Sequence, residues 1–237
     1  MAVENFTNYT EEDPGDDITV TTNKVEFTTL PRSARAYVYD DKGVDHFDGD
    51  FEHLLTINTT AEDNYSTSLY WCLFNSIGDL ANAGDGLHLT LRYNSGLGEP
   101  RALRIYEVYS STAYYSSAFE YSLDTDYYLK IKRDESVGTY GTIYCDVYTS
   151  EADRTNEENA VGNLSVTLHS KQDLRYIYAL QSNYNVANHV RSGYIQNLDL
   201  QEEAATNIKS YNGLLKASIK SINGLAIADI KSINGLA

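Results

Sequence analysis

The chain consists largely of short runs in which apolar and polar residues alternate. HLTLRY (88–93) and LSVTLH (164–169) are clear examples, with apolar residues at every second position. Successive side chains of a β-strand point to opposite faces, so this alternation predicts strands with one face packed on a core. The predicted strands are residues 17–22, 24–30, 34–40, 51–60, 68–74, 87–94, 102–109, 116–123, 127–134, 141–150, 163–170, 174–182 and 192–200.

The residues between these runs predict turns rather than helices. Glycine, asparagine, aspartate and serine fill most connections, and these residues favour tight turns. Only SIGDLANAG (76–84) and EADRTNEENAVG (151–162) could hold a turn or two of helix. About thirteen strands in one domain exceed the roughly seven of an immunoglobulin domain. We therefore predict an all-β fold, a two-sheet antiparallel jelly-roll sandwich.

Three strand-rich segments carry a distinctive order of aromatic, acidic and glycine residues. In ARAYVYDDKGVDHFDGDFEHLLTI (34–57), an aromatic strand leads through an acidic turn into an F-x-G-D-F-like strand. This segment resembles the opening of concanavalin A-like lectin and glucanase domains. YYLKIKRDESVGTYGTIYCDVYTS (127–150) resembles a later hairpin of that family, and SGYIQNLDL (192–200) resembles its closing strand. The resemblance implies a concanavalin A-like sandwich over residues 17–201. Residues 1–16 are polar and acidic, so we expect an extended arm before it.

The end of the chain repeats one eleven-residue phrase almost three times. The copies are IKSYNGLLKAS (208–218), IKSINGLAIAD (219–229) and IKSINGLA (230–237), after a linker at residues 202–207. Asn-Gly between apolar residues is a strong signal for a tight hairpin turn, so the repeats predict small β-hairpins. Such hairpins cannot bury their apolar residues alone. We therefore expect residues 208–237 to pack on copies of themselves, with a trimer as first choice, or on a neighbouring protein.

Each copy of the repeat contributes residues to both expected roles. The residues expected to form the turns are Asn212, Gly213, Asn223, Gly224, Asn234 and Gly235. Those expected to mediate oligomerisation and anchoring are Ile208, Tyr211, Leu214, Ile219, Ile222, Leu225, Ile227, Ile230, Ile233 and Leu236. Tails of this K-S-I-N-G-L-A kind resemble those that end structural proteins of tailed bacteriophages. The resemblance implies that the repeats anchor the protein to a virion, with the major capsid protein as one partner, and that the sandwich projects outward.

The composition is acidic and limits the expected partners. The chain has 34 acidic and 18 basic residues, which gives a formal net charge of −16. Such a surface repels phosphates and anionic membranes, so we expect neither nucleic-acid binding nor membrane insertion. The N-terminal residues lack the basic start and apolar core of a secretory signal, so we expect synthesis in the host cytoplasm and a final location on the virion surface. Cys72 and Cys145 are then expected to be buried free thiols, with a bridge between them as the open alternative.

The segment HFDGDFEH (46–53) is the main candidate for catalysis. On a strand, Asp48, Asp50 and Glu52 would share one face. Glycosidases of the concanavalin A-like fold carry acidic residues on one strand in a motif that resembles E-x-D-x-x-E, because hydrolysis needs two carboxyl groups close together. This chain lacks that motif, and Gly49 weakens a strand where rigid placement matters. We therefore predict no catalytic residues and no enzymatic activity.

Aspartates also crowd the same segment in a way that could hold a metal. Asp40, Asp41, Asp45, Asp48 and Asp50 offer the hard oxygen ligands that calcium prefers. Their spacing matches no defined calcium loop. Asp45, Asp48 and Asp50 are retained as candidates for a structural Ca²⁺, and no other cofactor is expected.

Two loop-like segments are rich in side chains that bind sugars. YSSTAYYSS (109–117) and QSNYNVANHV (181–190) combine tyrosine with serine or asparagine, although neither defines a site by itself. Three functions compete. The first is a non-enzymatic virion protein, either a capsid decoration protein or a head fibre, that displays a lectin-like domain. The alternative is an adhesin of a tail fibre that binds host-surface glycans, and a glycoside hydrolase ranks last. The fold alone cannot choose between them.

Overall fold

The computed structural model describes residues 3–78, 84–95, 99–182 and 188–201, together with four two-residue strands nearer the C-terminus. Val3–Leu200 forms one compact unit, and the C-terminal strands belong to another. Among the described residues, no helix has the length and apolar character needed to cross a membrane.

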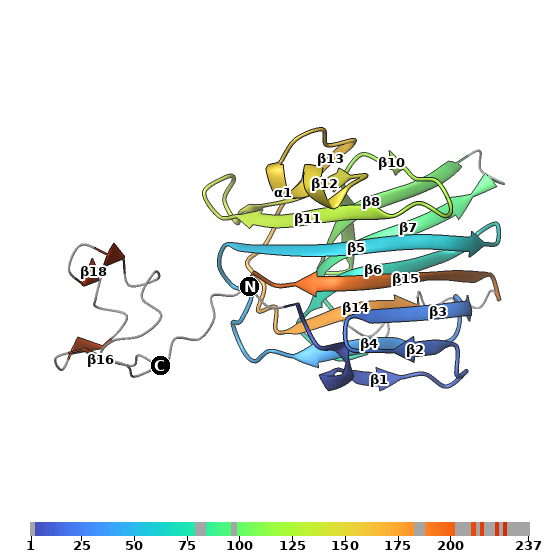
Figure 1. Ribbon diagram of the computed structural model, residues 1–237, viewed down its shortest axis with the longest axis horizontal. Helices are drawn as coiled ribbons and strands as arrows, with labels where there is room; N and C mark the ends of the chain where they lie inside the picture. Colours follow the sequence, from blue (N-terminus) through green and yellow to red (C-terminus); the bar gives the residue numbers. More distant parts are fainter. Residues whose placement is uncertain are drawn as a thin grey trace. The chain divides into compact units, whose positions relative to one another are not determined.

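The unit Val3–Leu200 is a sandwich of two antiparallel sheets (Figure 1). The eight-stranded sheet has the order β1 (Thr10–Glu12), β4 (Tyr37–Asp41), β14 (Tyr176–Ser182), β6 (Thr67–Phe74), β7 (Gly86–Asn94), β8 (Glu99–Tyr109) and β10 (Phe119–Glu120), with β9 (Thr112–Tyr115) also paired to β8. The seven-stranded sheet has the order β13 (Gly162–Thr167), β12 (Thr142–Tyr148), β11 (Tyr127–Asp134), β5 (Phe51–Glu62), β15 (Val190–Asp199), β3 (Lys24–Pro31) and β2 (Ile18–Val20).

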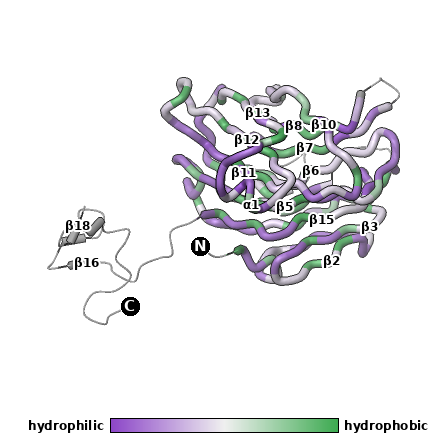
Figure 2. The backbone as a smooth tube through the Cα atoms, turned by 45° about the horizontal axis from the view of Figure 1, so that its top comes forward, coloured by the Kyte–Doolittle hydropathy of each residue, from purple (hydrophilic) through white to green (hydrophobic). Residues whose placement is uncertain are grey.

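The core lies between the two sheets and is built by the alternation seen in the sequence. On β7, Leu87, Leu89 and Leu91 are buried in one apolar cluster, and on β11 Leu129 and Ile131 join it from the other sheet. Changes of colour along the strands in Figure 2 follow this alternation of hydrophobic and hydrophilic residues. The predicted all-β, two-sheet jelly-roll sandwich is therefore confirmed.

The sandwich begins earlier than the sequence predicts. Residues 1–16 were expected to form an extended arm, but within them Phe6–Asn8 form a turn of 3-10 helix and β1 pairs with β4 at a sheet edge. Phe6 is fully buried and contacts the ring of Tyr9 edge-on, with 5.3 Å between ring centroids. Burial of this aromatic side chain stabilises the segment against the sandwich.

Three other elements refine the prediction. The predicted strand 116–123 is reduced to β10, because Ser116 uses its hydroxyl to bond the backbone of β8 and interrupts the ladder. β9 precedes it and was not predicted. The region 151–162 holds one short helix, α1 (Glu151–Asn156). The other helical prediction, 76–84, lies partly outside the described residues.

The C-terminal strands form two small antiparallel pairs. β16 (Ser210–Tyr211) pairs with β17 (Leu214–Leu215), and β18 (Ser221–Ile222) pairs with β19 (Leu225–Ala226). In each pair the facing inner residues are three positions apart in the sequence. All six expected turn residues lie outside the described residues, as do all of the expected anchoring residues except Tyr211, Leu214, Ile222 and Leu225. The anchoring role therefore stays a prediction.

Both cysteines are buried free thiols, as expected. Cys145 on β12 belongs to the core between the sheets, whereas Cys72 on β6 lies in a second apolar cluster on the outer face of the eight-stranded sheet. Burial raises the pKa of both thiols, which keeps them protonated and unreactive.

A buried ion pair within the seven-stranded sheet is hydrogen-bonded to the eight-stranded sheet. Glu62 on β5 and Arg191 on β15 are 2.6 Å apart, and their side chains are 0% and 1% exposed. Arg191 also donates from Nη1 to the carbonyl oxygen of Leu91 on β7, at 2.8 Å. The Glu62 carboxylate accepts further bonds from Arg101 Nε and Tyr121 Oη, each at 2.7 Å. The buried charges of Glu62 and Arg191 therefore have hydrogen-bond partners on both sheets.

We expect Arg191→Met to lower the free energy of unfolding by about 3 kcal/mol or more, because it leaves a buried carboxylate without its main partner. Chemical denaturation measures the change. The matched control is Lys132→Met, which removes a cation that is 51% exposed and lies 4.0 Å from Asp134; we expect it to cost less than about 1 kcal/mol. Equal losses in the two variants would contradict this account of the pair.

Two buried histidines make stability depend on pH. Trp71 Nε1 donates to His53 Nδ1 at 3.1 Å, and His88 Nδ1 lies 2.7 Å from Thr90 Oγ1. Burial lowers the pKa of each histidine from 6.5 to about 3. The unfolded chain therefore binds these protons first as the pH falls. The stability is fully present above pH 6.5 and is lost as the pH falls toward 3.

We expect each histidine to remove about 2 kcal/mol of the free energy of unfolding between pH 6.5 and about 5. Denaturation titrations across this range measure the loss. His88→Gln and His53→Gln should each flatten part of the slope, and the double variant should flatten more than either. A wild-type stability that stays constant over this range would show that these side chains are not held neutral by burial.

Candidate functional site

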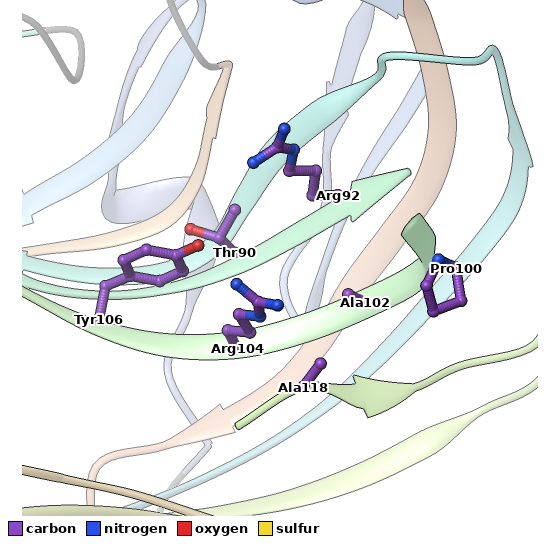
Figure 3. Close-up of a pocket in the computed structure, with 7 residues that line it drawn as sticks. All are labelled: Thr90, Arg92, Pro100, Ala102, Arg104, Tyr106 and Ala118. Atoms are coloured by element: carbon purple, nitrogen blue, oxygen red, sulfur yellow. The ribbon is translucent and has the colours of Figure 1, made fainter. Parts of the chain in front are cut away.

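The site is built on the outer face of the eight-stranded sheet, where β7 and β8 lie side by side. Their leucines and Ile105 point into the core, so the alternate residues point outward. Thr90 on β7 faces Arg104 on β8, and His88 faces Tyr106. Figure 3 shows Thr90, Arg104 and Tyr106 on the same side of the two strands, with Arg92 beside them.

These outward side chains line a groove, here named the β7–β8 groove. Its main hollow has a volume of ≈ 340 Å³ and continues into a smaller one of ≈ 40 Å³ over β8. The lining residues are Arg32, Thr67, His88, Thr90, Arg92, Pro100, Ala102, Arg104, Tyr106, Val108, Ala113 and Ala118. No carboxylate is among the residues that line it in the described part of the chain. The groove therefore has a basic lining in an acidic protein.

Arg104 is the clearest part of this basic lining. Its guanidinium lies 5.1 Å from the centre of the Tyr115 ring, a cation–π contact. Its Nε is buried without a hydrogen-bond partner, and it forms no ion pair with any described residue. By contrast, Arg101 on the same strand is paired with Glu62. Arg104 thus offers unused donors to the groove.

Arg32 and Arg92 place two more cations at one end of the groove. Arg32 Nη1 donates to the carbonyl oxygen of Tyr65 at 3.1 Å, and its Nε is buried without a partner. Burial lowers the pKa of Arg32, and the nearby charge of Arg92 lowers it further. The two guanidinium groups are therefore close enough for the charge of Arg92 to act on Arg32.

Aromatic rings form the opposite part of the lining. The rings of His88 and Tyr106 are stacked, with centroids 4.8 Å apart and an angle of 12° between their planes. Tyr106 then contacts Tyr115 at 5.2 Å. Tyr115 is 57% exposed and presents an aromatic ring to solvent. His88, by contrast, is 4% exposed, and the pKa of about 3 keeps it neutral near pH 7.

The other half of the same sheet face is closed rather than open. Phe74 and Tyr178 are fully buried there, with Tyr39 stacked on Tyr178 at 5.5 Å. Residues 76–78 cover this half, since the Gly78 amide donates to Tyr178 Oη at 3.2 Å and Gln181 Nε2 donates to the Gly78 carbonyl oxygen at 2.6 Å. The β7–β8 groove is therefore bounded by a covered aromatic cluster.

The acidic segment 46–53 does not form the arrangement expected from the sequence. β5 begins at Phe51, so Asp48 and Asp50 precede the strand and do not share a strand face with Glu52. Each of the three has another partner. Asp48 pairs with Lys171 at 3.3 Å, Asp50 Oδ1 accepts from the Glu135 amide at 2.7 Å, and Glu52 pairs with Lys130 at 2.8 Å. These partners turn the carboxylates into structural groups.

The calcium candidates belong to the same turn. The backbone amide of Asp45 donates a hydrogen bond to Asp173 Oδ1 at 2.8 Å. Nowhere in the described ranges do three or more histidine, cysteine, aspartate or glutamate side chains gather as a metal site would require. Asp45, Asp48 and Asp50 therefore do not come together as a ligand set.

One of the two tyrosine-rich segments noted in the sequence reaches the groove. Ala113, in 109–117, lines the groove, although residues 112–115 form β9 and not a loop. In 181–190, Gln181 is buried and residues 183–187 lie outside the described residues. Sequence reasoning missed Arg92, Arg104 and the rest of the β7–β8 lining. The signal was present in HLTLRY (88–93), whose polar positions hold histidine, threonine and arginine in a chain poor in basic residues.

No family model matches the chain, and no curated protein matches it. The resemblance of the C-terminal repeats to phage virion proteins therefore has no support from these comparisons.

Solved structures do share the fold. A legume lectin-like domain from Entamoeba histolytica is 14% identical, with a TM-score of 0.54 over 82% of this chain and 90% of that one. The alginate lyase Aly36B is 12% identical, with a TM-score of 0.51 over 81% and 86%. A PL-14 alginate lyase from Aplysia kurodai is 11% identical, with a TM-score of 0.50 over 77% and 86%. At this identity the similarity shows the fold alone, which is that of the lectin-like, concanavalin A-like jelly rolls.

Proposed function

We propose that the sandwich binds carbohydrate in the β7–β8 groove without cleaving it. The single observation that carries this proposal is a groove lined by Arg104, whose guanidinium has unused donors and lies against the exposed aromatic ring of Tyr115. An aromatic face packs on the apolar face of a sugar ring, and fixed polar groups orient its oxygens. The fold shared with a legume lectin-like domain supports the same proposal.

The absence of cleavage is part of the proposal. Glycoside hydrolysis uses a pair of carboxyl groups that flank the bond to be broken. The lining residues of the groove in the described part of the chain include no aspartate or glutamate, so this pair is missing where a saccharide would lie. Asp48, Asp50 and Glu52 are held by other partners, as described above.

Cleavage by elimination is the second candidate function, because a lyase needs no carboxylate pair. The observation that favours it is the stacking of Tyr106 on His88 beside Arg104 in the same groove, which supplies acid–base groups next to a cation. Two of the similar structures are alginate lyases. It ranks second because His88 is almost fully buried and its pKa of about 3 makes it a poor base near neutral pH.

The C-terminal repeats supply the second half of the proposal. We propose that residues 208–237 fasten the sandwich to a larger particle, either through copies of itself or through another virion protein such as the major capsid protein. The protein would then be a capsid decoration protein or head fibre on a virion surface, or in the alternative an adhesin of a tail fibre that binds host glycans. The supporting observations are the near-identical repeats and the two short strand pairs within them.

We expect Tyr115→Ala to weaken binding of a saccharide that the wild-type protein retains by about tenfold, because it removes an aromatic anchor. Affinity electrophoresis against a panel of acidic and neutral polysaccharides measures the effect. Tyr140→Ala is the matched control, since Tyr140 is 43% exposed and lies between β11 and β12 on the other sheet.

New reducing ends are counted in the same incubations. Unchanged polymers with Tyr115-dependent binding support the proposal. If reducing ends accumulate with the wild-type protein but not with Tyr106→Phe, the groove cleaves the polymer by elimination, and the proposal of binding without cleavage is wrong. Failure of the whole panel to bind would overturn carbohydrate binding.

Removal of residues 202–237 should leave a folded monomer. The unit Val3–Leu200 has its own core, so we expect its thermal transition to change little. We expect the full chain, in contrast, to form an oligomer through the repeats. Light scattering of both proteins measures the mass. Asn223→Ala with Gly224→Ala serves as a milder variant, because it removes one predicted hairpin turn. A truncated protein with the same mass per particle as the full chain would refute the anchoring role.

A further inference from the structure

We propose that the saccharide bound in the β7–β8 groove is anionic, with carboxylate or sulfate oxygens that accept hydrogen bonds from Arg104, Arg92 and Arg32. This inference rests on the proposed function, and it names the chemical class of the ligand. Guanidinium groups present planar sets of donors that match carboxylate and sulfate oxygens, often in pairs of parallel bonds.

The charge distribution is the first argument. The chain carries an excess of acidic residues, with a formal net charge of −16, so a cation on its surface readily finds a carboxylate. On the surface Arg175 pairs with Asp41, and in the interior Arg191 pairs with Glu62. Arg104 and Arg32 form no ion pair with any residue that the structure describes. Within the described part of the chain, these two cations both line the β7–β8 groove, Arg104 in its smaller hollow and Arg32 in its main hollow.

The second argument is burial of unsatisfied donors. The Nε atoms of Arg104 and Arg32 are each buried without a hydrogen-bond partner. A buried donor that has lost water and gained no acceptor costs free energy. The Nε atoms of Arg133, Arg154 and Arg191 are also buried without a partner, but of these five arginines only Arg104 and Arg32 line the groove, where a ligand can supply the acceptors. A neutral sugar hydroxyl would satisfy the hydrogen bond but would leave the charge uncompensated.

The third argument is the order of the cations along the groove. Arg104 faces Thr90 across the β7–β8 pair, and Arg92 lies two residues beyond Thr90 on β7. Diagonal neighbours of this kind are separated by roughly 7–8 Å at their Cβ atoms. Arg32 lies close enough to Arg92 for its charge to be felt. Cations spaced along the groove fit a polymer with charges on successive sugar units better than a single anion.

The aromatic rings distinguish this ligand from other polyanions. Tyr115 presents its ring to solvent next to Arg104, and Tyr106 stands between Tyr115 and His88. A sugar ring can pack on this surface while its acidic group reaches the guanidinium. The net charge of the whole protein repels extended nucleic acids and anionic membranes. Contact with a flexible saccharide chain inside the groove involves only the local cations, because charges farther away are screened within about 8 Å at physiological salt.

The test uses the full chain and four polymers. Alginate carries carboxylates, its methyl ester has lost that charge, carrageenan carries sulfates, and dextran is neutral. Binding is measured by isothermal titration calorimetry with wild type, Arg104→Gln and Arg104→Lys. The control is Lys132→Gln, which makes the same change in net charge on the seven-stranded sheet, at a side chain that is 51% exposed.

We expect alginate or carrageenan to bind and the methyl ester and dextran to bind at least tenfold more weakly. Arg104→Gln should weaken binding of the acidic polymer by about 10- to 100-fold, as loss of a hydrogen bond to a charged group does. Arg104→Lys should fall between Arg104→Gln and wild type, because it keeps the charge and loses the planar set of donors. Lys132→Gln should match wild type. The preferred polymer then identifies carboxylate or sulfate as the anion.

Two other outcomes have different meanings. If dextran or the methyl ester binds as tightly as the acidic polymers, with loss in Tyr115→Ala and none in Arg104→Gln, the inference fails and the proposed function stands. If no polymer binds, or if binding persists unchanged in both Tyr115→Ala and Arg104→Gln, the groove is not the site and both fail. Thermal melting of Arg104→Gln confirms that it is folded, and Arg104→Lys provides a second test at the same position.

Discussion

The geometry of the site depends on the buried ion pair between Glu62 and Arg191. This pair lies between the sheets, and Arg191 also donates to the carbonyl oxygen of Leu91 on β7. The next residue, Arg92, points outward into the groove. The pair therefore fixes the backbone of β7 at Leu91, directly before the residue whose cation lines the groove on the outer face. Arg101, which also bonds Glu62, fixes β8 in the same way three residues before Arg104.

The eight-stranded sheet has two faces with different physical roles. Its inner face is apolar and is closed by the seven-stranded sheet. Its outer face is divided: over β14 and β6, a cluster of aromatic and apolar side chains is covered by residues 76–78, and over β7, β8 and β9 the groove is open. A rigid strand pair is a good platform for recognition, because strand residues are held more precisely than loop residues. The cation–π contact with Tyr115 offsets part of the free-energy cost of partly burying the Arg104 guanidinium on this face.

The acidic composition and the basic groove act at different distances. The net charge sets the long-range field, which opposes polyanions in general. The guanidinium groups act over a few ångströms, where salt screens little and geometry decides. A protein with this arrangement gains selectivity, since only a ligand that enters the groove experiences the attraction. The carboxylates that the sequence made prominent, at positions 48, 50 and 52, instead bind the neighbouring lysines and a backbone amide.

The sequence by itself determined most of the strands and the fold class, and it favoured free thiols at the two cysteines, which the structure confirms. It could do so because alternation of apolar and polar residues is a local property, and each strand buries one face whatever its neighbours are. It also contained the residues of the groove, in the polar positions of HLTLRY and in Arg104 and Tyr106. Only the tertiary structure decided which polar faces were solvent-exposed, which were buried and which lined the groove. Glu107 occupies an inward position of β8, where it is fully buried and accepts hydrogen bonds from the His169 amide, whereas Arg104 and Tyr106 on the same strand line the groove. Strand order and sheet packing are set by contacts between residues far apart in the chain, and those contacts decide whether a charge meets solvent, a partner or a ligand.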